Sequence, residues 1–193
     1  MDRRELLKMI VAATGAAMIG LPALASGQGP AAGTKAAFSA ADIALMDEIA
    51  DTILPRTKTP GAKDTGIGAF MATFVADCYT AQQQATFRAG LADIDKRAGG
   101  RFVSLTPQAR TELLRAVDAD AKKHAANAAN AGPRNAESAE AKAHYFTMLK
   151  QLTIFGFFTS KIGATEVLQY VAVPGRYDGD LAYVAGTPAW GTS

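Results

Sequence analysis

Residues 67–79, Ile-Gly-Ala-Phe-Met-Ala-Thr-Phe-Val-Ala-Asp-Cys-Tyr, carry the clearest helical pattern of the chain. Their large apolar side chains recur every three or four residues, which is the spacing of a wide stripe along one face of an α-helix. The stripe consists of Ile67, Phe70, Met71, Phe74, Val75, Cys78 and Tyr79. The pattern predicts a helix that buries this face, Cys78 included, in a core.

A second helix is predicted before this stretch, from Ser39 to Pro55. Ser39 is a good N-cap, and Asp42 stands where a variant of the capping box places its acidic residue. Phe38 and Ile43 are spaced to form a hydrophobic staple across the cap. Pro55 ends the helix because the residue before a proline avoids helical angles.

Further helices are predicted after it. One spans roughly residues 81–98 and stops at Gly99-Gly100, and another begins at Thr106-Pro107. The inward-facing residues of the two are Phe87, Leu91, Ile94, Leu113, Leu114 and Val117. Residues 119–143 are rich in alanine and broken by Gly132-Pro133, which indicates a helix end, an exposed connection and a helix start.

The last long helix is predicted from about Ser138 to Phe158, and its second half is apolar almost all round. Such a helix is either central to a bundle or covered by a second protein. No strand-like alternation runs long enough to predict a sheet. We therefore expect an all-α fold, a single helical bundle of about five to six helices with an irregular C-terminal tail.

Composition excludes several classes of function. The net charge is only +2, and the basic residues do not gather in a cluster of the kind that nucleic-acid binding requires. The sole cysteine, Cys78, excludes an internal disulfide, and it is either buried or paired with another chain. The sequence offers no haem attachment motif, His124 and His144 lack the spacing of a zinc site, and one cysteine cannot hold an iron–sulfur cluster. We expect no catalytic, cofactor-binding or metal-binding residues in this chain.

The first 25 residues have the order of an export signal. Two arginines precede a mild apolar run over residues 9–21, and a small-x-small cleavage site follows it. The order resembles the twin-arginine signal, which is associated with cargo that is already folded, and it predicts a periplasmic protein. The signal residues are Arg3, Arg4, Leu6, Leu7 and Lys8, and the cleavage site is Ala23 and Ala25. The predicted organisation is a signal peptide (1–25), a flexible linker (26–37) and one helical domain (38–193).

The tail after the last helix carries aromatic and arginine side chains of the kind that anchor interfaces. Pro174-Gly175 favours a tight turn between them. The candidates for contact with a partner are Phe157, Phe158, Tyr170, Pro174, Gly175, Arg176 and Tyr177. The alternative is a tail that folds back on its own bundle.

Several motifs together resemble the gluconate 2-dehydrogenase subunit 3 family. They are residues 153–160, Gly163-Ala164, residues 170–177, and the early segments 50–55 and 59–62. The likeness extends from about Ala40 to Trp190. It implies a non-catalytic small subunit that binds a large FAD-dependent sugar dehydrogenase and carries it through twin-arginine export, with haem c in a cytochrome subunit.

This resemblance fits a chain that has an export signal for folded cargo and no cofactor motif of its own. The complex is then expected at the inner membrane, through its partner subunits. Cys78 offers a thiol for an intersubunit disulfide. The alternatives are a free-standing periplasmic helical binding module and, less in keeping with the missing motifs, an enzyme in its own right.

Overall fold

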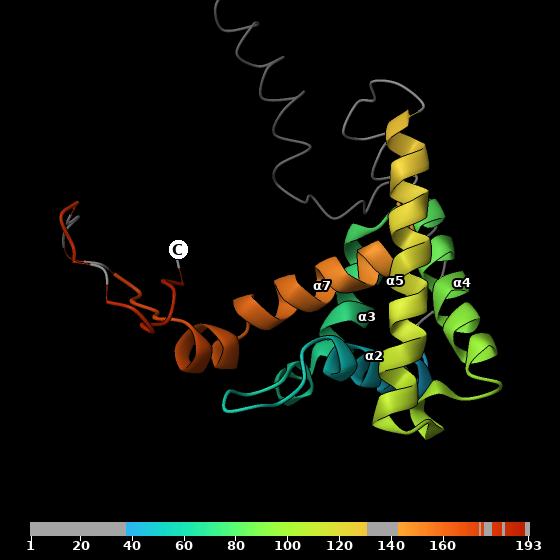
Figure 1. The fold of residues 1–193 in the computed structure, drawn as a ribbon, viewed down its shortest axis with the longest axis horizontal. Coiled ribbons are helices and arrows are strands. Elements are labelled where there is room, and N and C mark those ends of the chain that lie inside the picture. The colour runs from blue at the N-terminus through green and yellow to red at the C-terminus, as the bar shows by residue number, and fades with distance from the viewer. Residues whose placement is uncertain (1–37, 131–142, 174, 176–178, 183, 192–193) are drawn as a thin grey trace, which may run out of the picture. The chain divides into compact units, whose positions relative to one another are not determined.

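The structure is a computed structural model, and it describes residues 38–130, 143–173, 175, 179–182 and 184–191 of the 193-residue chain. Within these residues the fold is helical (Figure 1). The α-helices are α2 (Ala40–Ile53), α3 (Ile67–Cys78), α4 (Ala81–Arg97), α5 (Pro107–Asn130) and α7 (Tyr145–Thr159). The short helical turns are η1 (Ala62–Thr65), η2 (Phe102–Ser104) and the π-helical η3 (Gly163–Val167). The prediction of an all-α fold is confirmed.

Local sequence signals set the start of α2 as predicted. The Ser39 hydroxyl accepts from the backbone N–H of Asp42 at 3.1 Å, and the Asp42 carboxylate accepts from the Ser39 N–H at 2.9 Å. Phe38 and Ile43 are half-buried and pack against the core. The helix ends at Ile53, two residues before Pro55. This reciprocal capping box satisfies N–H groups that have no partner inside the helix.

The next two helices also follow their predicted boundaries. Helix α4 has a second capping box, made by Thr80 and Gln83, which we did not predict. It ends at two glycines with positive φ, Gly99 at 72° and Gly100 at 151°. Helix α5 begins at Pro107, where the Thr106 hydroxyl accepts from a backbone N–H of the first turn at 3.3 Å.

Helix α7 begins later than predicted. Ala143 and His144 are not helical, and α7 starts at Tyr145 rather than near Ser138. The reason is that His144 serves as the N-cap, because its Nδ1 accepts from the backbone N–H of Phe146 at 3.2 Å. The earlier part of the predicted helix, residues 138–142, lies outside the described residues.

Helix α7 packs against most of the bundle, as expected of a central helix, although one strip of its surface stays exposed. It contacts α2, α3, α4 and α5, and in Figure 1 it begins beside α5 and runs to the left above α3. The core is closed by fully buried apolar side chains from every α-helix. They include Met46, Ile49, Met71, Val75, Phe87, Ile94, Val117 and Leu149.

No helix among the described residues is both long and apolar enough to cross a bilayer. The described residues after α7 and η3 form no further helix, as predicted for an irregular tail. One parallel bridge joins Gln169 to Trp190, and the Gln169 side-chain amide donates to the Pro188 carbonyl at 3.0 Å. The bridge closes the base of a loop over residues 169–191.

Candidate functional site

One side of α7 leaves large apolar side chains in solvent. Seven residues of this helix are buried, yet Ile154 and Phe155 are each 49% exposed and Phe158 is 37% exposed. Their spacing places them on a single strip of the helix surface. The sequence could not distinguish this strip from the buried faces, because α7 is apolar in nearly every direction.

Helix α3 extends the strip with aromatic rings. The Phe155 ring centroid lies 6.0 Å from that of Phe70 and 5.7 Å from that of Phe74, and Phe74 lies 5.8 Å from Tyr79. These separations are typical of favourable ring pairs. The rings of Phe155, Phe70, Phe74 and Tyr79 therefore pack against one another. We call Phe70, Phe74, Ile154, Phe155 and Phe158 the α3–α7 face.

A groove of about 860 Å³ continues the α3–α7 face. Of the described residues that line it, none is Asp, Glu, Lys, Arg or His. The lining consists of Phe74, Cys78, Tyr79, Thr80, Ala81, Gln82, Gln83, Ala143, Met148, Gln151, Leu152 and Phe155. The groove thus combines apolar and aromatic side chains with the uncharged polar groups of threonine and glutamine.

Cys78 is exposed, so the prediction that it is buried is wrong. Ile67, Met71 and Val75 of the α3 stripe are buried as predicted, whereas Phe70, Phe74 and Tyr79 are half-buried. The stripe continues into the last turn of α3, but that turn borders the groove instead of another helix. The thiol is therefore accessible, and a disulfide to another chain stays a prediction.

The predicted partner-contact residues fall into three groups. Phe157 is 4% exposed and belongs to the core, so it offers no surface to a partner. Phe158, Tyr170 and Gly175 are exposed. Pro174, Arg176 and Tyr177 lie outside the described residues, as do the signal residues Arg3, Arg4, Leu6, Leu7 and Lys8 and the cleavage residues Ala23 and Ala25.

The tail adds exposed apolar side chains that the sequence analysis did not single out. They are Val171, Val173, Leu181, Val184 and Trp190, of which Val173 is the most exposed at 82%. Exposed apolar side chains that gather into a patch mark interaction sites. The tail residues therefore support the alternative in which the tail contacts a partner.

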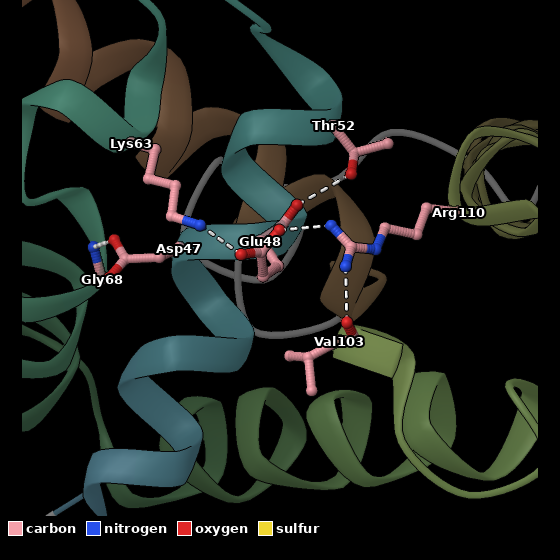
Figure 2. Close-up of polar contacts among 7 residues, drawn as sticks. All are labelled: Asp47, Glu48, Thr52, Lys63, Gly68, Val103 and Arg110. Atoms are coloured by element: carbon pink, nitrogen blue, oxygen red, sulfur yellow. Dashed lines mark hydrogen bonds and ion pairs between the residues drawn. The ribbon is translucent and has the colours of Figure 1, made fainter. Parts of the chain in front are cut away.

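A polar network on the α2 side stabilises the fold (Figure 2). The Glu48 carboxylate accepts from Lys63 and from Arg110, and Arg110 also donates to the Val103 carbonyl. Burial raises the pKa of Glu48, but the hydrogen bonds and charges of Lys63 and Arg110 outweigh it and hold that pKa below its ordinary value. A carboxylate paired in this way is a structural anchor and a poor general base.

A second contact in Figure 2 explains how α3 starts. Gly66, before the helix, has no side chain to cap it, and the Asp47 carboxylate from α2 accepts from the Gly68 N–H at 2.7 Å instead. Among the described residues, no group of three or more His, Cys, Asp and Glu side chains is placed to hold a metal ion. The α3–α7 face and its groove are thus the strongest site candidate.

Comparison with known proteins gives one match. The model of a family described as gluconate 2-dehydrogenase subunit 3 matches residues 40–175. No curated protein and no solved structure matches the chain. The matched range includes every α-helix described above and confirms the resemblance noted in the sequence. Since it covers well over half of the residues, this chain belongs to the gluconate 2-dehydrogenase subunit 3 family.

Proposed function

We propose that this chain is the non-catalytic small subunit of a periplasmic FAD-dependent sugar or sugar-acid dehydrogenase. Membership of the family implies a subunit of a multi-subunit dehydrogenase complex. The finer roles that we assign are binding the flavoprotein subunit and carrying it through twin-arginine export. The flavin, and haem c where a cytochrome subunit is present, then belong to the partner subunits, which also hold the complex at the inner membrane.

The observation that carries the proposal is the exposed α3–α7 face. Ile154 and Phe155 leave about half of their side-chain surface in water, next to an uncharged groove. Burial of apolar area contributes roughly 25 cal/mol for each Å² removed from water. A partner that covers this face therefore gains binding free energy, and no described residue that lines the groove is charged.

The chemistry of the groove also defines the partner surface that fits it. Since its described lining residues are apolar, aromatic or uncharged polar, the matching surface of the flavoprotein is uncharged and carries hydrogen-bonding groups beside its apolar ones. Binding of this kind depends weakly on ionic strength, because salt screens charges and leaves apolar contacts intact. We expect the affinity to change little between low and high salt.

The test is co-expression of the chain with a tagged flavoprotein subunit from the same complex. Ile154→Lys places a charge on the exposed strip of α7, and Ala119→Lys places the same charge on an exposed position of α5 as a control. We expect Ile154→Lys to lose co-purification of the flavoprotein and its arrival in the periplasm. Ala119→Lys retains both.

Export is tested separately by replacing Arg3 and Arg4 with lysine. This variant is expected to keep the complex together and to retain both subunits in the cytoplasm. A flavoprotein that still reaches the periplasm at normal levels would contradict the carrier role. Normal co-purification with Ile154→Lys would contradict the role of the α3–α7 face, and a chain that stays monomeric with every flavoprotein offered would favour the free-standing binding module.

A further inference from the structure

His144 lies at the start of α7, where only its neutral form can accept a hydrogen bond from the helix backbone. It is the N-cap of α7, and its Nδ1 accepts the Phe146 N–H at 3.2 Å. A protonated imidazole has two N–H donors and no acceptor, so acid removes this hydrogen bond. The positive charge then faces the positive end of the helix dipole as well.

A second histidine lies against the first. The ring centroid of His124, on α5, is 5.7 Å from that of His144 although the two residues are far apart in the sequence. His144 is half-buried and also stacks on Tyr145, with ring centroids 4.3 Å apart. A positive charge on His144 would therefore develop at the contact between α5 and the start of α7.

Charged groups from α4 and α5 surround His144. Asp93 and Arg97 face His144 from α4, and Asp120 faces it from α5 beside His124. Arg97 pairs with both carboxylates, at 2.7 Å to Asp93 and 2.8 Å to Asp120. The Tyr145 hydroxyl donates to Asp93 at 2.6 Å. The two carboxylates act to raise the pKa of His144 and the guanidinium acts to lower it, and burial together with the His124 ring outweighs the carboxylates.

Burial of His144 and the nearby His124 ring keep the pKa of His144 below its ordinary value of 6.5. The sign follows from linkage. A histidine with a lowered pKa in the folded state binds fewer protons there than in the unfolded state. Its contribution to stability is full above about pH 6.5 and is lost as the pH falls from there through the folded-state value.

We propose that His144 and His124 form an acid-sensitive latch between α5 and α7. At neutral pH the neutral His144 ring caps α7 and lies against His124. In mild acid the cap is lost, a positive charge develops beside the His124 ring, and the first turn of α7 opens.

The latch borders the groove, because Ala143 directly precedes His144 and Met148 lies in the first turns of α7, and both line it. Opening this turn displaces part of the groove wall. Acid is therefore expected to weaken the hold on the flavoprotein, a consequence that rests on the proposed function. The latch itself is a property of the isolated chain and does not depend on a partner.

The test is an NMR titration of the purified chain between about pH 7.5 and 5.0, with and without His144→Asn. Asparagine is a good N-cap and does not titrate, so this variant keeps the cap and removes the switch. The readouts are the histidine ring resonances, the Phe146 amide, and the opening equilibrium of the α7 amides after correction for intrinsic exchange. A lost N-cap corresponds to about a fivefold change in that equilibrium.

We expect the Phe146 amide and the His144 ring to titrate together below pH 6.5 in the wild type, with about fivefold more opening at pH 5.0. His144→Asn removes this change, and His124→Gln reduces it. A Phe146 amide that does not follow the His144 ring overturns the proposal, and so does equal acid opening in His144→Asn. A third arm measures flavoprotein binding: no binding at neutral pH contradicts the proposed function, while the amide readout still decides the latch.

Discussion

The guanidinium of Arg110 on α5 forms an ion pair with the carboxylate of Glu48 on α2, across a sequence separation of 62 residues. The same guanidinium donates to the Val103 carbonyl in η2, and Lys63 in η1 forms an ion pair with Glu48 from the other side. One carboxylate thus ties α2, η1 and α5 together (Figure 2). Both partners are largely buried, since their side chains are 16% and 18% exposed.

Arg110→Ala is expected to lower the free energy of unfolding by about 2 kcal/mol, measured by denaturant unfolding at neutral pH. Breaking a fully buried pair costs about 3–5 kcal/mol, whereas exposed pairs contribute about 0–1 kcal/mol. This pair lies between those limits, and the buried Arg110 Nε, which has no hydrogen-bond partner among the described residues, reduces the net stabilisation that the pair provides.

The control is Arg56→Ala. Arg56 pairs with Asp64 but is 68% exposed, so this variant should be nearly as stable as the wild type. Equal decreases of the free energy of unfolding in both variants would show that burial of an ion pair does not determine how much its loss destabilises the protein.

Glu48→Gln is expected to remove part of the acid dependence of stability. The folded-state pKa of Glu48 is lowered, so its ion pairs contribute stability above the ordinary value of 4.5 and lose it as the pH falls through the folded-state value. Unfolding curves of the two proteins should therefore differ most at neutral pH and converge in acid. A constant difference at every pH would contradict the assignment.

Asp51 provides a control of opposite sign on the same helix. Its burial, and to a smaller degree the nearby Glu48 and Asp64 carboxylates, raise its pKa above the ordinary value of 3.8, although Lys63 and Arg110 act against the shift. A raised pKa means that stability falls as the pH rises from about 3.8 through the folded-state value. Asp51→Asn should therefore gain a little stability at neutral pH, where Glu48→Gln loses some.

Gly68→Ala is expected to destabilise the protein, although alanine is the better helix former by about 1 kcal/mol. A Cβ at position 68 would lie 2.4 Å from the Ile43 carbonyl oxygen and 2.9 Å from the Asp47 carboxylate. The obstacle at Ile43 is backbone and cannot rotate away, so α2 and α3 must separate, at a cost of about 1–3 kcal/mol. Thermal unfolding measures the change.

The neighbouring position supplies the control for this prediction. Ala69 is exposed on the same turn of α3, so Ala69→Gly reports helix propensity alone and should lose about 1 kcal/mol. If Gly68→Ala instead raises the melting temperature, the close approach of α2 and α3 is not tight in solution.

Signals within a few residues of one another predicted much of the fold. The reciprocal bonds of Ser39 and Asp42, the paired glycines after α4 and the helical span of α3 each depend on local geometry, and each is found where the sequence places it. The late start of α7 was missed because histidine is an uncommon N-cap, and its role depends on a neutral Nδ1 that the sequence does not specify.

The candidate site was only partly predictable, because it depends on which helices meet. The pattern of α7 is apolar in most directions, so it did not indicate that Ile154 and Phe155 stay in solvent while Phe157 is buried. The contact between His124 and His144 and the ion pair of Glu48 with Arg110 likewise join separate helices. Contacts between separate helices do not produce a periodic pattern in the sequence, so they could not be predicted from it.

Cys78 provides the last prediction, since it is exposed at the rim of the groove and is the sole cysteine of the chain. A maleimide should modify the folded chain completely, at a rate close to that of the unfolded chain. Cys78→Ser should change the free energy of unfolding by no more than about 0.5 kcal/mol, as is usual for surface substitutions. Mass spectrometry and denaturant unfolding measure the two effects.

The same thiol reports whether the groove is covered in the complex. If the flavoprotein binds over the groove, it should slow labelling of Cys78 by far more than that of a cysteine placed at Ala119 on α5 in the Cys78→Ser background. A reducible band of the combined mass on a non-reducing gel would show an intersubunit disulfide, whereas slowed labelling without that band indicates coverage alone. Equal labelling of Cys78 with and without the bound flavoprotein would place the interface elsewhere, and the exposed tail residues around Trp190 would then become the site to test.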